Sequence, residues 1–212
     1  MKDTKENILE VATDMFANGD FDSISTRDIA KKASVNLSAI SYYFENKEGL
    51  YVAVIKKMID FVKESNKSWV NSILNFTFSQ SKEENLNNFL EIMDEFVECV
   101  INNNKENNNR NSIIWSKNNS KIALVLDIVY NELHIPLSEA FIKIISSITS
   151  LKNNDIKTIF VVNSITGQLV EILIHKEMIL KSLGIKEFNV EHLNILKEVV
   201  INQTKAIIDL YR

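Results

Sequence analysis

The sequence is poor in the residues that build turns and special sites. Its 212 residues include only four Gly, one Pro and one Cys. Scarce Gly and Pro, together with few alternating apolar and polar runs, leave little material for hairpins or barrels, so the sequence predicts an all-α chain. The single Cys99 excludes an intrachain disulfide and a Cys-rich zinc site.

Membrane, enzyme and metal signatures are also missing. No apolar run reaches the roughly 20 residues that a membrane span requires, and Met1–Ala12 is charged, so we expect a cytoplasmic protein without a membrane partner. No Gly-rich phosphate loop, G-x-S-x-G motif or paired His/carboxylate constellation is present. His134, His175 and His192 lack metal-ligand spacing. We therefore expect no enzyme, no metal and no cofactor.

The stretch from Ile24 to Leu50 has the pattern of a short helix, a turn and a second short helix. Ser25 or Thr26 can cap the first helix, whose core-facing residues are Ile29, Ala30 and Ala33. A tight bend is predicted at Ser34-Val35-Asn36, where Val35 would plug the space between the two helices.

The second helix, about Leu37 to Phe44, buries Ile40 and Phe44 at an i, i+4 spacing and turns a small, polar and aromatic face outward. Such a face suits a recognition helix, which must enter a major groove about 12 Å wide. The predicted DNA contacts are Thr26, Arg27, Asn36, Leu37, Ser38, Ala39, Ser41, Tyr42, Tyr43 and Lys47. The two tyrosines would reach phosphates, although aromatic packing under the next helix is an alternative for them.

Lys47 follows in the first turn of a fourth helix, with Asn46 as its cap. A cation and free backbone N–H groups then point together at an anion, which predicts a phosphate contact. The net charge of −4 argues against nonspecific coating of nucleic acid. Placement of the cations within the helix-turn-helix stretch matters more for phosphate contact than the total charge.

These motifs resemble the N-terminal domain of the TetR family of bacterial transcriptional regulators, over roughly Thr4 to Val54. The matching residues are Ala12, Phe16, Gly19, Thr26, Arg27, Ile29, Ala30, Tyr42, Tyr43, Phe44, Lys47 and Leu50. The sequence departs from the family at Ser34, where Gly is usual. The resemblance implies a helix-turn-helix DNA-binding domain, which we place at residues 1–47.

Residues 48–212 are expected to form a helical effector-binding and dimerisation domain. The fourth helix, which runs to about Ser65 or, as a longer alternative, to Phe78, would join it to the first domain. The stretch Asn102–Asn111 is too polar to pack and predicts a surface loop. Ser120 to His134 has the pattern of another helix, with Pro136 in the bend that follows.

Two later segments, Asp127–Ile145 and Ser164–Gly184, resemble the ligand-binding domain of one TetR subgroup through E-L-x-x-P and small-x-x-G-Q patterns. Asn131 stands where that subgroup usually has Arg. The resemblance implies a small-molecule effector, whose identity the sequence does not give. The candidate lining residues are mostly large apolar side chains, and for each of them a place in the plain hydrophobic core is the alternative. They are Phe61, Trp69, Phe89, Met93, Phe96, Trp115, Phe141 and Gln168.

The last two predicted helices, about Asn154–Leu183 and Asn189–Tyr211, are more apolar than one small bundle can bury. This predicts a homodimer with a four-helix interface, whose two recognition helices would lie about 34 to 36 Å apart on a palindromic operator. The family resemblance favours a repressor released by its effector. The alternative is a helical dimeric protein-interaction module that does not bind DNA, because acidic residues outnumber basic ones within residues 1–48.

Overall fold

Helices make up every regular element in the part of the chain that the computed structural model describes, which is residues 3–102 and 121–212. The all-α prediction is therefore confirmed. Nearly all of the predicted loop at Asn102–Asn111 lies outside the described residues, and so does the effector candidate Trp115. None of the described helices combines the length and the apolarity needed to cross a membrane.

The chain divides into two units, one made of residues 1–62 and 105–133 and the other of residues 63–104 and 134–212. The chain passes from one unit to the other within two helical segments, near the end of the fourth helix and just before His134. These units are not the domains expected from the sequence, a DNA-binding domain at residues 1–47 and an effector-binding and dimerisation domain at residues 48–212. That division stays a prediction.

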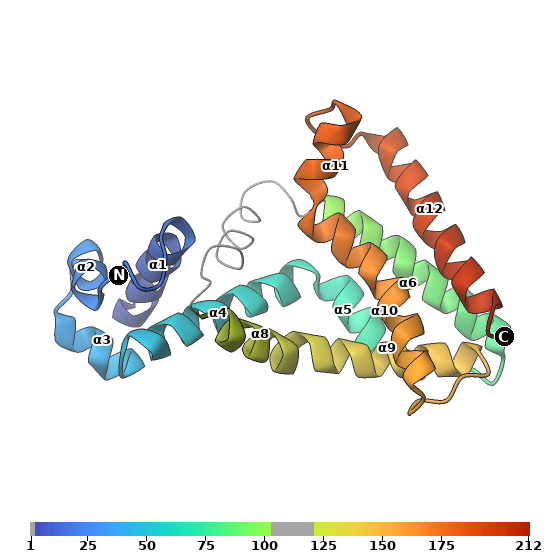
Figure 1. Ribbon diagram of the computed structural model, residues 1–212, viewed down its shortest axis with the longest axis horizontal. Helices are drawn as coiled ribbons and strands as arrows, with labels where there is room; N and C mark the ends of the chain where they lie inside the picture. The colour runs from blue at the N-terminus through green and yellow to red at the C-terminus, as the bar shows by residue number, and fades with distance from the viewer. Residues whose placement is uncertain (1–2, 103–120) are drawn as a thin grey trace. The chain divides into compact units, whose positions relative to one another are not determined.

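The first unit contains α1 (Thr4–Asn18), α2 (Thr26–Lys32), α3 (Leu37–Phe44), most of α4 (Lys47–Ser65) and α8 (Ile122–Val129) (Figure 1). Helix α1 begins after the cap Asp3 and ends at Gly19. Its buried residues recur at helical spacing and pack into one core with residues of the other four helices. That core includes Ile8, Ala12, Phe16, Ile29, Ile40, Leu50, Tyr51, Val54, Ile55, Val125 and Ile128.

An aromatic trio ties α1, the turn after it and α4 together. The ring of Tyr51 meets Phe16 and Phe21 edge-on, with centroids 5.0 Å apart in both pairs. Phe16 and Phe21 stack on each other at 5.9 Å. Edge-to-face aromatic pairs add about 0.5–1.5 kcal/mol beyond their buried area, so this cluster holds α1 and the turn after it against α4.

Side chains cap both α2 and α3, and the cap of α2 is Ser25, one of the two residues predicted for that role. The side chain of Ser25 accepts a hydrogen bond from the amide of Asp28, at 3.1 Å, and begins α2. Asn36 accepts from the amide of Ser38, at 3.1 Å, and begins α3. These side chains satisfy amides that have no partner within the helix, which fixes where each helix begins.

The bend between α2 and α3 is a Schellman motif closed by Ser34. The amide of Val35 donates to the carbonyl of Ala30, at 3.0 Å, and the amide of Ser34 donates to Lys31, at 3.2 Å. Ser34 has a φ of 56°, in the left-handed region where Gly is favoured. The departure from the family pattern therefore falls at the one position of this turn that needs a positive φ.

The second unit contains α5 (Lys67–Leu74), α6 (Lys82–Asn102), α9 (Ile135–Ile148), α10 (Ile156–Ile174), α11 (Lys176–Leu183) and α12 (Val190–Asp209). In Figure 1, α12 follows the length of α6. The core of this unit includes Trp69, Ile73, Phe89, Met93, Phe96, Phe141, Ile144, Ile148, Ile165, Leu169, Val200 and Ile208.

One helix boundary agrees with the sequence-based expectation and another differs from it. Helix α4 ends at Ser65, as expected, because Asn66 leaves the helical region with φ −116° and ψ 23°; α5 is therefore a separate helix, and the longer alternative that reaches Phe78 is wrong. The long helix expected over residues 154–183 is split at His175, which has φ −105° and ψ 19°. At each break a single residue leaves the helical conformation while the apolar pattern continues across it. The pattern alone therefore does not show where one helix ends and the next begins.

The bend expected near Pro136 is instead a π-helical turn, η2 (Tyr130–His134), that joins α8 to α9. Pro136 occupies the first turn of α9. Proline has no N–H to donate to an earlier carbonyl, and a single widened turn is a common way for a helix to absorb such an interruption.

Candidate nucleic-acid interface

Helix α3 separates a buried face from an exposed one, as predicted. Ile40 and Phe44 are 1% and 6% exposed and belong to the core of the first unit. The opposite face carries Ser38, Ser41, Tyr42 and Leu37 in the open. The fold therefore leaves short polar side chains at the start of the helix, where a recognition helix meets base edges.

The two tyrosines of α3 differ in their surroundings. Tyr42 is 81% exposed, whereas Tyr43 is 36% exposed and its ring lies 6.3 Å from that of Phe44. The rings of Tyr42 and Tyr43 meet edge-on at 4.9 Å. Ala39 is half-buried and packs partly against the core, so it offers less surface than its neighbours.

Helix α2 adds cations beside this face. Arg27, Lys31 and Lys32 are exposed, and Thr26 is half-buried at the helix start. Within the described residues, none of these three cations has an ion-pair partner. Exposed cations without internal partners are available to phosphate oxygens, which take most protein–DNA hydrogen bonds.

Helices α1 and α4 hold the two short helices in place. The side-chain amide of Asn7 donates to the carbonyl of Ala33 at the end of α2, at 2.8 Å. An ion pair between Lys57 and Glu6 links α4 to α1. The exposed face of α3 is thus presented by a packed scaffold that ties all of the first four helices together.

Lys47 lies at the start of α4 but does not extend freely into solvent. Its Nζ atom is 4.2 Å from the centroid of the Phe21 ring, a cation–π contact. Burial lowers the pKa of Lys47, the Asp22 carboxylate acts to raise it, and the charge of Lys121 lowers it further. Neither Phe21 nor Lys121 was identified from the sequence, because nothing in the local pattern links them to Lys47.

The predicted effector residues that the structure describes belong to both units. Trp69, Phe89, Met93, Phe96 and Phe141 share the core of the second unit, whereas Phe61 is 37% exposed in the first unit. The Trp69 and Phe96 rings are 4.7 Å apart, and those of Phe89 and Phe141 are 5.9 Å apart.

Two of these effector candidates end in buried polar atoms without a hydrogen-bond partner among the described residues. They are the indole Nε1 of Trp69 and the amide oxygen of Gln168. The other end of the Gln168 amide donates to the hydroxyl of Thr204 on α12, at 2.9 Å. Buried polar atoms rarely remain unpaired without a reason.

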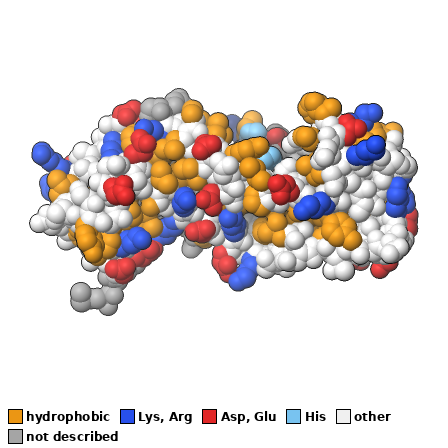
Figure 2. Space-filling model, turned by 90° about the horizontal axis from the view of Figure 1, so that it is seen from below, with side chains coloured by type: hydrophobic (Ala, Val, Ile, Leu, Met, Phe, Trp, Pro, Cys, Tyr) orange, Lys and Arg blue, Asp and Glu red, His pale blue; other side chains and the backbone are white. Residues whose placement is uncertain are grey.

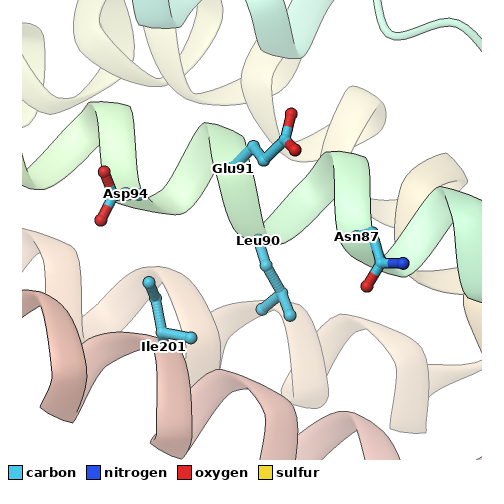
Figure 3. Close-up of a pocket in the computed structure, with 5 residues that line it drawn as sticks. All are labelled: Asn87, Leu90, Glu91, Asp94 and Ile201. Carbon is cyan, nitrogen blue, oxygen red and sulfur yellow. The ribbon is translucent and has the colours of Figure 1, made fainter.

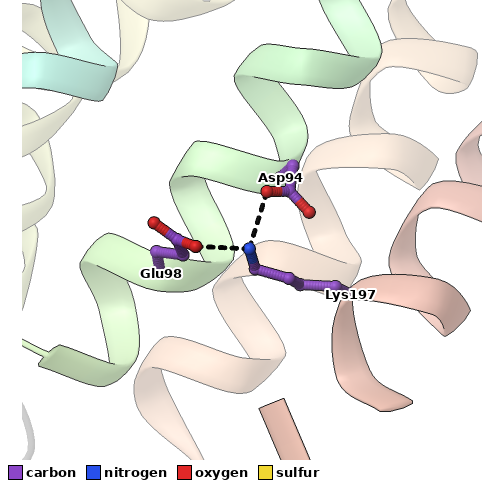
Figure 4. A network of polar contacts seen from close by, with 3 residues as sticks. All are labelled: Asp94, Glu98 and Lys197. Carbon is purple, nitrogen blue, oxygen red and sulfur yellow. Dashed lines mark hydrogen bonds and ion pairs between the residues drawn. The ribbon is translucent and has the colours of Figure 1, made fainter. Parts of the chain in front are cut away.

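A groove of about 540 Å³ lies on the surface of the second unit between α6 and α12 (Figure 3). Its lining residues are Asn87, Leu90, Glu91, Asp94 and Ile201. None of the eight predicted effector residues is among them. At one end, Lys197 of α12 contacts Asp94 at 2.6 Å and Glu98 at 2.5 Å, which fastens α12 to α6 (Figure 4).

Metal chemistry has no visible site in the described ranges. Across residues 3–102 and 121–212, no group of three or more His, Cys, Asp or Glu side chains is placed to hold a metal ion.

Two family models match this chain. Residues 8–54 match the model of bacterial regulatory proteins of the tetR family, and residues 123–209 match the C-terminal domain of the HTH-type transcriptional dual regulator CecR. The first match covers α2, α3 and the start of α4, which carry the predicted DNA contacts. The second begins within α8 and ends with α12.

Relatives in sequence are transcriptional regulators. The chain is 27% identical over 184 residues to the HTH-type transcriptional dual regulator CecR of Shigella flexneri, covering 85% of this chain and 78% of the relative. It is 32% identical over 90 residues to the HTH-type regulator YttP of Bacillus subtilis, covering 42% of each. RutR of Escherichia coli strain K12 matches at 38% identity over 56 residues, or 26% of each chain.

Solved structures share the fold. A crystal structure described as a TetR-family transcriptional regulator from Mesorhizobium loti superposes with a TM-score of 0.59 at 14% identity, covering 98% of this chain and 96% of that one. A regulator of the TetR/AcrR family from Thermobifida fusca has a TM-score of 0.50 at 16% identity, with 98% of both chains covered. At these identities the likeness shows the fold alone.

Proposed function

The chain belongs to the TetR family of bacterial transcriptional regulators, and on this premise we propose that it is a ligand-responsive repressor. As a dimer it binds a palindromic operator, and a small-molecule effector releases it. The DNA-binding domain comprises residues 1–47, and residues 48–212 bind the effector and dimerise. The protein acts in the cytoplasm, where its DNA lies.

The observation that carries this proposal is the exposed face of α3. Ser38, Ser41 and Tyr42 project from a helix whose other side is fixed in the core by Ile40 and Phe44. In this arrangement the early residues of α3 reach base edges in the major groove, and the tyrosines and Lys47 contact phosphates. Base contacts set the sequence, whereas phosphate contacts set the position on the duplex.

A mobility-shift titration on fragments of the protein's own promoter region tests DNA binding. The wild-type chain should shift one fragment, with an affinity that falls by orders of magnitude between about 50 and 200 mM salt. Lys47→Ala should weaken all sequences alike, whereas Ser38→Ala should change sequence preference. No shift above nonspecific binding on any fragment would contradict the proposal and favour the protein-interaction alternative.

Exposed apolar residues on α10 and α12 support the dimer. The outward side of α10 carries Ile156, Ile159 and Phe160, at 67%, 42% and 65% exposure. Helix α12 exposes Val190, Ile195 and Val199. Hydrophobic side chains also occur among charged ones on the face drawn in Figure 2, so a mutational comparison is needed to identify the interface.

Phe160→Glu should convert the dimer to monomers by placing a charge in the interface, as measured by sedimentation or light scattering. The matched control is Leu74→Glu on α5, an exposed apolar residue outside the two helices, at 46% exposure. It should leave the mass unchanged. If both variants remain dimeric, the interface lies elsewhere.

The unpaired polar atoms of Trp69 and Gln168 support an effector site in the second unit. We place there a largely apolar molecule that accepts a hydrogen bond from the indole of Trp69 and donates one to the amide oxygen of Gln168. Trp69→Phe removes the donor and keeps an aromatic ring. It should abolish release from the promoter fragment by compounds that release the wild type, while Phe78→Leu, in the exposed loop after α5, should respond normally.

A further inference from the structure

Helix α8 belongs by sequence to the C-terminal half but packs on the core of the first unit, where Val125 and Ile128 are buried. Ion pairs at both ends of this segment fix it against α4. Lys121, just before α8, pairs with Glu48, and Glu132, just after α8, pairs with Lys56 at 2.9 Å.

The order of these pairs gives the direction of α8. Glu48 precedes Lys56 along the chain, and their partners Lys121 and Glu132 follow in the same order. Helices α8 and α4 therefore run side by side in the same direction. The beginning of α8 therefore lies at the beginning of α4. That end of α4 holds Lys47 and directly follows α3.

Two ammonium groups share one aromatic ring at this end. The Nζ atom of Lys47 is 4.2 Å from the centroid of the Phe21 ring, and that of Lys121 is 5.1 Å from the same centroid. The repulsion between them is offset by the ring and by the carboxylates of Asp22 and Glu48. Two cations placed this close together, beside amides of the first turn of a helix, favour an anion.

We propose that Lys121 is a DNA-contact residue that binds the operator backbone beside Lys47, on the same or the adjacent phosphate. The inference rests on the proposed function, because it assumes that the start of α4 faces the duplex. The contact comes from outside the helix-turn-helix domain and outside the family model matched at residues 8–54.

Glu48 competes with the phosphate for Lys121. Its side chain is 54% exposed, whereas that of Lys121 is 27% exposed. A phosphate oxygen approaching Lys121 must displace this carboxylate or approach despite its charge. Removing the carboxylate should therefore strengthen DNA binding, and removing the ammonium group should weaken it.

The experiment measures the salt dependence of binding to the promoter fragment that the wild type shifts, by fluorescence anisotropy between about 50 and 200 mM KCl. Lys121→Gln should weaken binding to all sequences and reduce the slope of log K against log salt by about 0.9 for each bound subunit. Lys143→Gln, at an exposed lysine of α9 in the second unit, is the control and should match the wild type.

Glu48→Gln separates a DNA contact from a purely structural ion pair. If Lys121 binds DNA, this variant binds more tightly than the wild type. If Lys121 serves only to hold Glu48, both single variants weaken binding to a similar extent and neither reduces the slope, which would overturn the inference. Glu48→Gln leaves Lys121 unchanged, so it tests the inference even if Lys121→Gln fails to fold. A wild type that shifts no fragment would instead refute the proposed function itself.

Discussion

The carbonyl oxygen of Phe44 occupies the space that a Cβ atom on Gly49 would need. Between these residues, the amide of Asn46 donates to the Phe44 carbonyl, at 2.7 Å, and the amide of Gly49 donates to the Asn46 side chain, at 2.9 Å. Glu45, with φ 66° and ψ −56°, forms the γ-turn that permits this approach. The end of the recognition helix is therefore set by the absence of a side chain at Gly49.

Gly49→Ala should destabilise the protein by about 2 kcal/mol, because its methyl group can be placed only by moving backbone atoms. The measurement is the free energy of unfolding in urea. DNA affinity should also fall, since the shift displaces α3. Asp60→Ala, at an exposed position of the same helix, is the control. Equal stability of both variants would show that the junction relaxes without cost.

Ser34→Gly should stabilise the protein by about 1 kcal/mol, because Ser pays a steric cost at φ 56° that Gly does not. The chain contains its own reference, since α11 ends in the same Schellman motif with Gly184 at φ 68°. Gly184→Ser should therefore destabilise the protein by a similar amount. Changes of the same sign in the two variants would contradict this account.

The local features of the first unit were predictable from the sequence. Ser25, Asn36 and Asn46 cap helices through contacts within three residues of themselves. The burial of Ile40 and Phe44 follows from their spacing alone. These features depend on neighbours along the chain, and such neighbours are visible in the sequence.

Contacts between distant residues were not predictable. The amphipathic pattern of α8 shows that one face is buried, but not that Val125 and Ile128 join the core of the first unit. Lys197 meets Asp94 across 103 positions. The effector candidates illustrate the same limit. A large apolar residue gives the same sequence pattern whether it lines a cavity or, like Phe89 and Phe96, belongs to a hydrophobic core.

Lys197→Met should lower the free energy of unfolding near neutral pH by about 1 kcal/mol, the upper end for partly exposed ion pairs. Met keeps the apolar stem of a side chain that is only 17% exposed. Burial lowers the pKa of Lys197, but hydrogen bonds to Asp94 and Glu98 outweigh it, so the net pKa lies above the ordinary 10.5.

The raised pKa of Lys197 fixes the sign of the pH dependence. Its stabilising effect is fully present below the pKa of the unfolded chain and is lost as the pH rises through the folded value. The difference between wild type and Lys197→Met should thus shrink as the pH rises beyond the ordinary lysine pKa of 10.5. Lys205→Met is the control for general alkaline effects. A difference that stays constant across the alkaline range would assign the loss to packing rather than charge.

Cys99 should react slowly with thiol reagents in the native protein. Burial and the carboxylates of Glu95 and Glu98 raise the pKa of the thiol above its ordinary 9.0, against an opposing hydrogen bond with the Trp69 backbone. Only the thiolate is nucleophilic, so labelling near pH 8 should be much slower than in the urea-unfolded chain.

Glu95→Gln should raise the native labelling rate of Cys99 and move its pH midpoint down, because it removes a nearby negative charge. Glu91→Gln, on the same helix, should change neither the rate nor the pH midpoint, because Glu91 is not among the groups that shift the pKa of Cys99. A native rate equal to that of the unfolded chain would contradict this environment for Cys99.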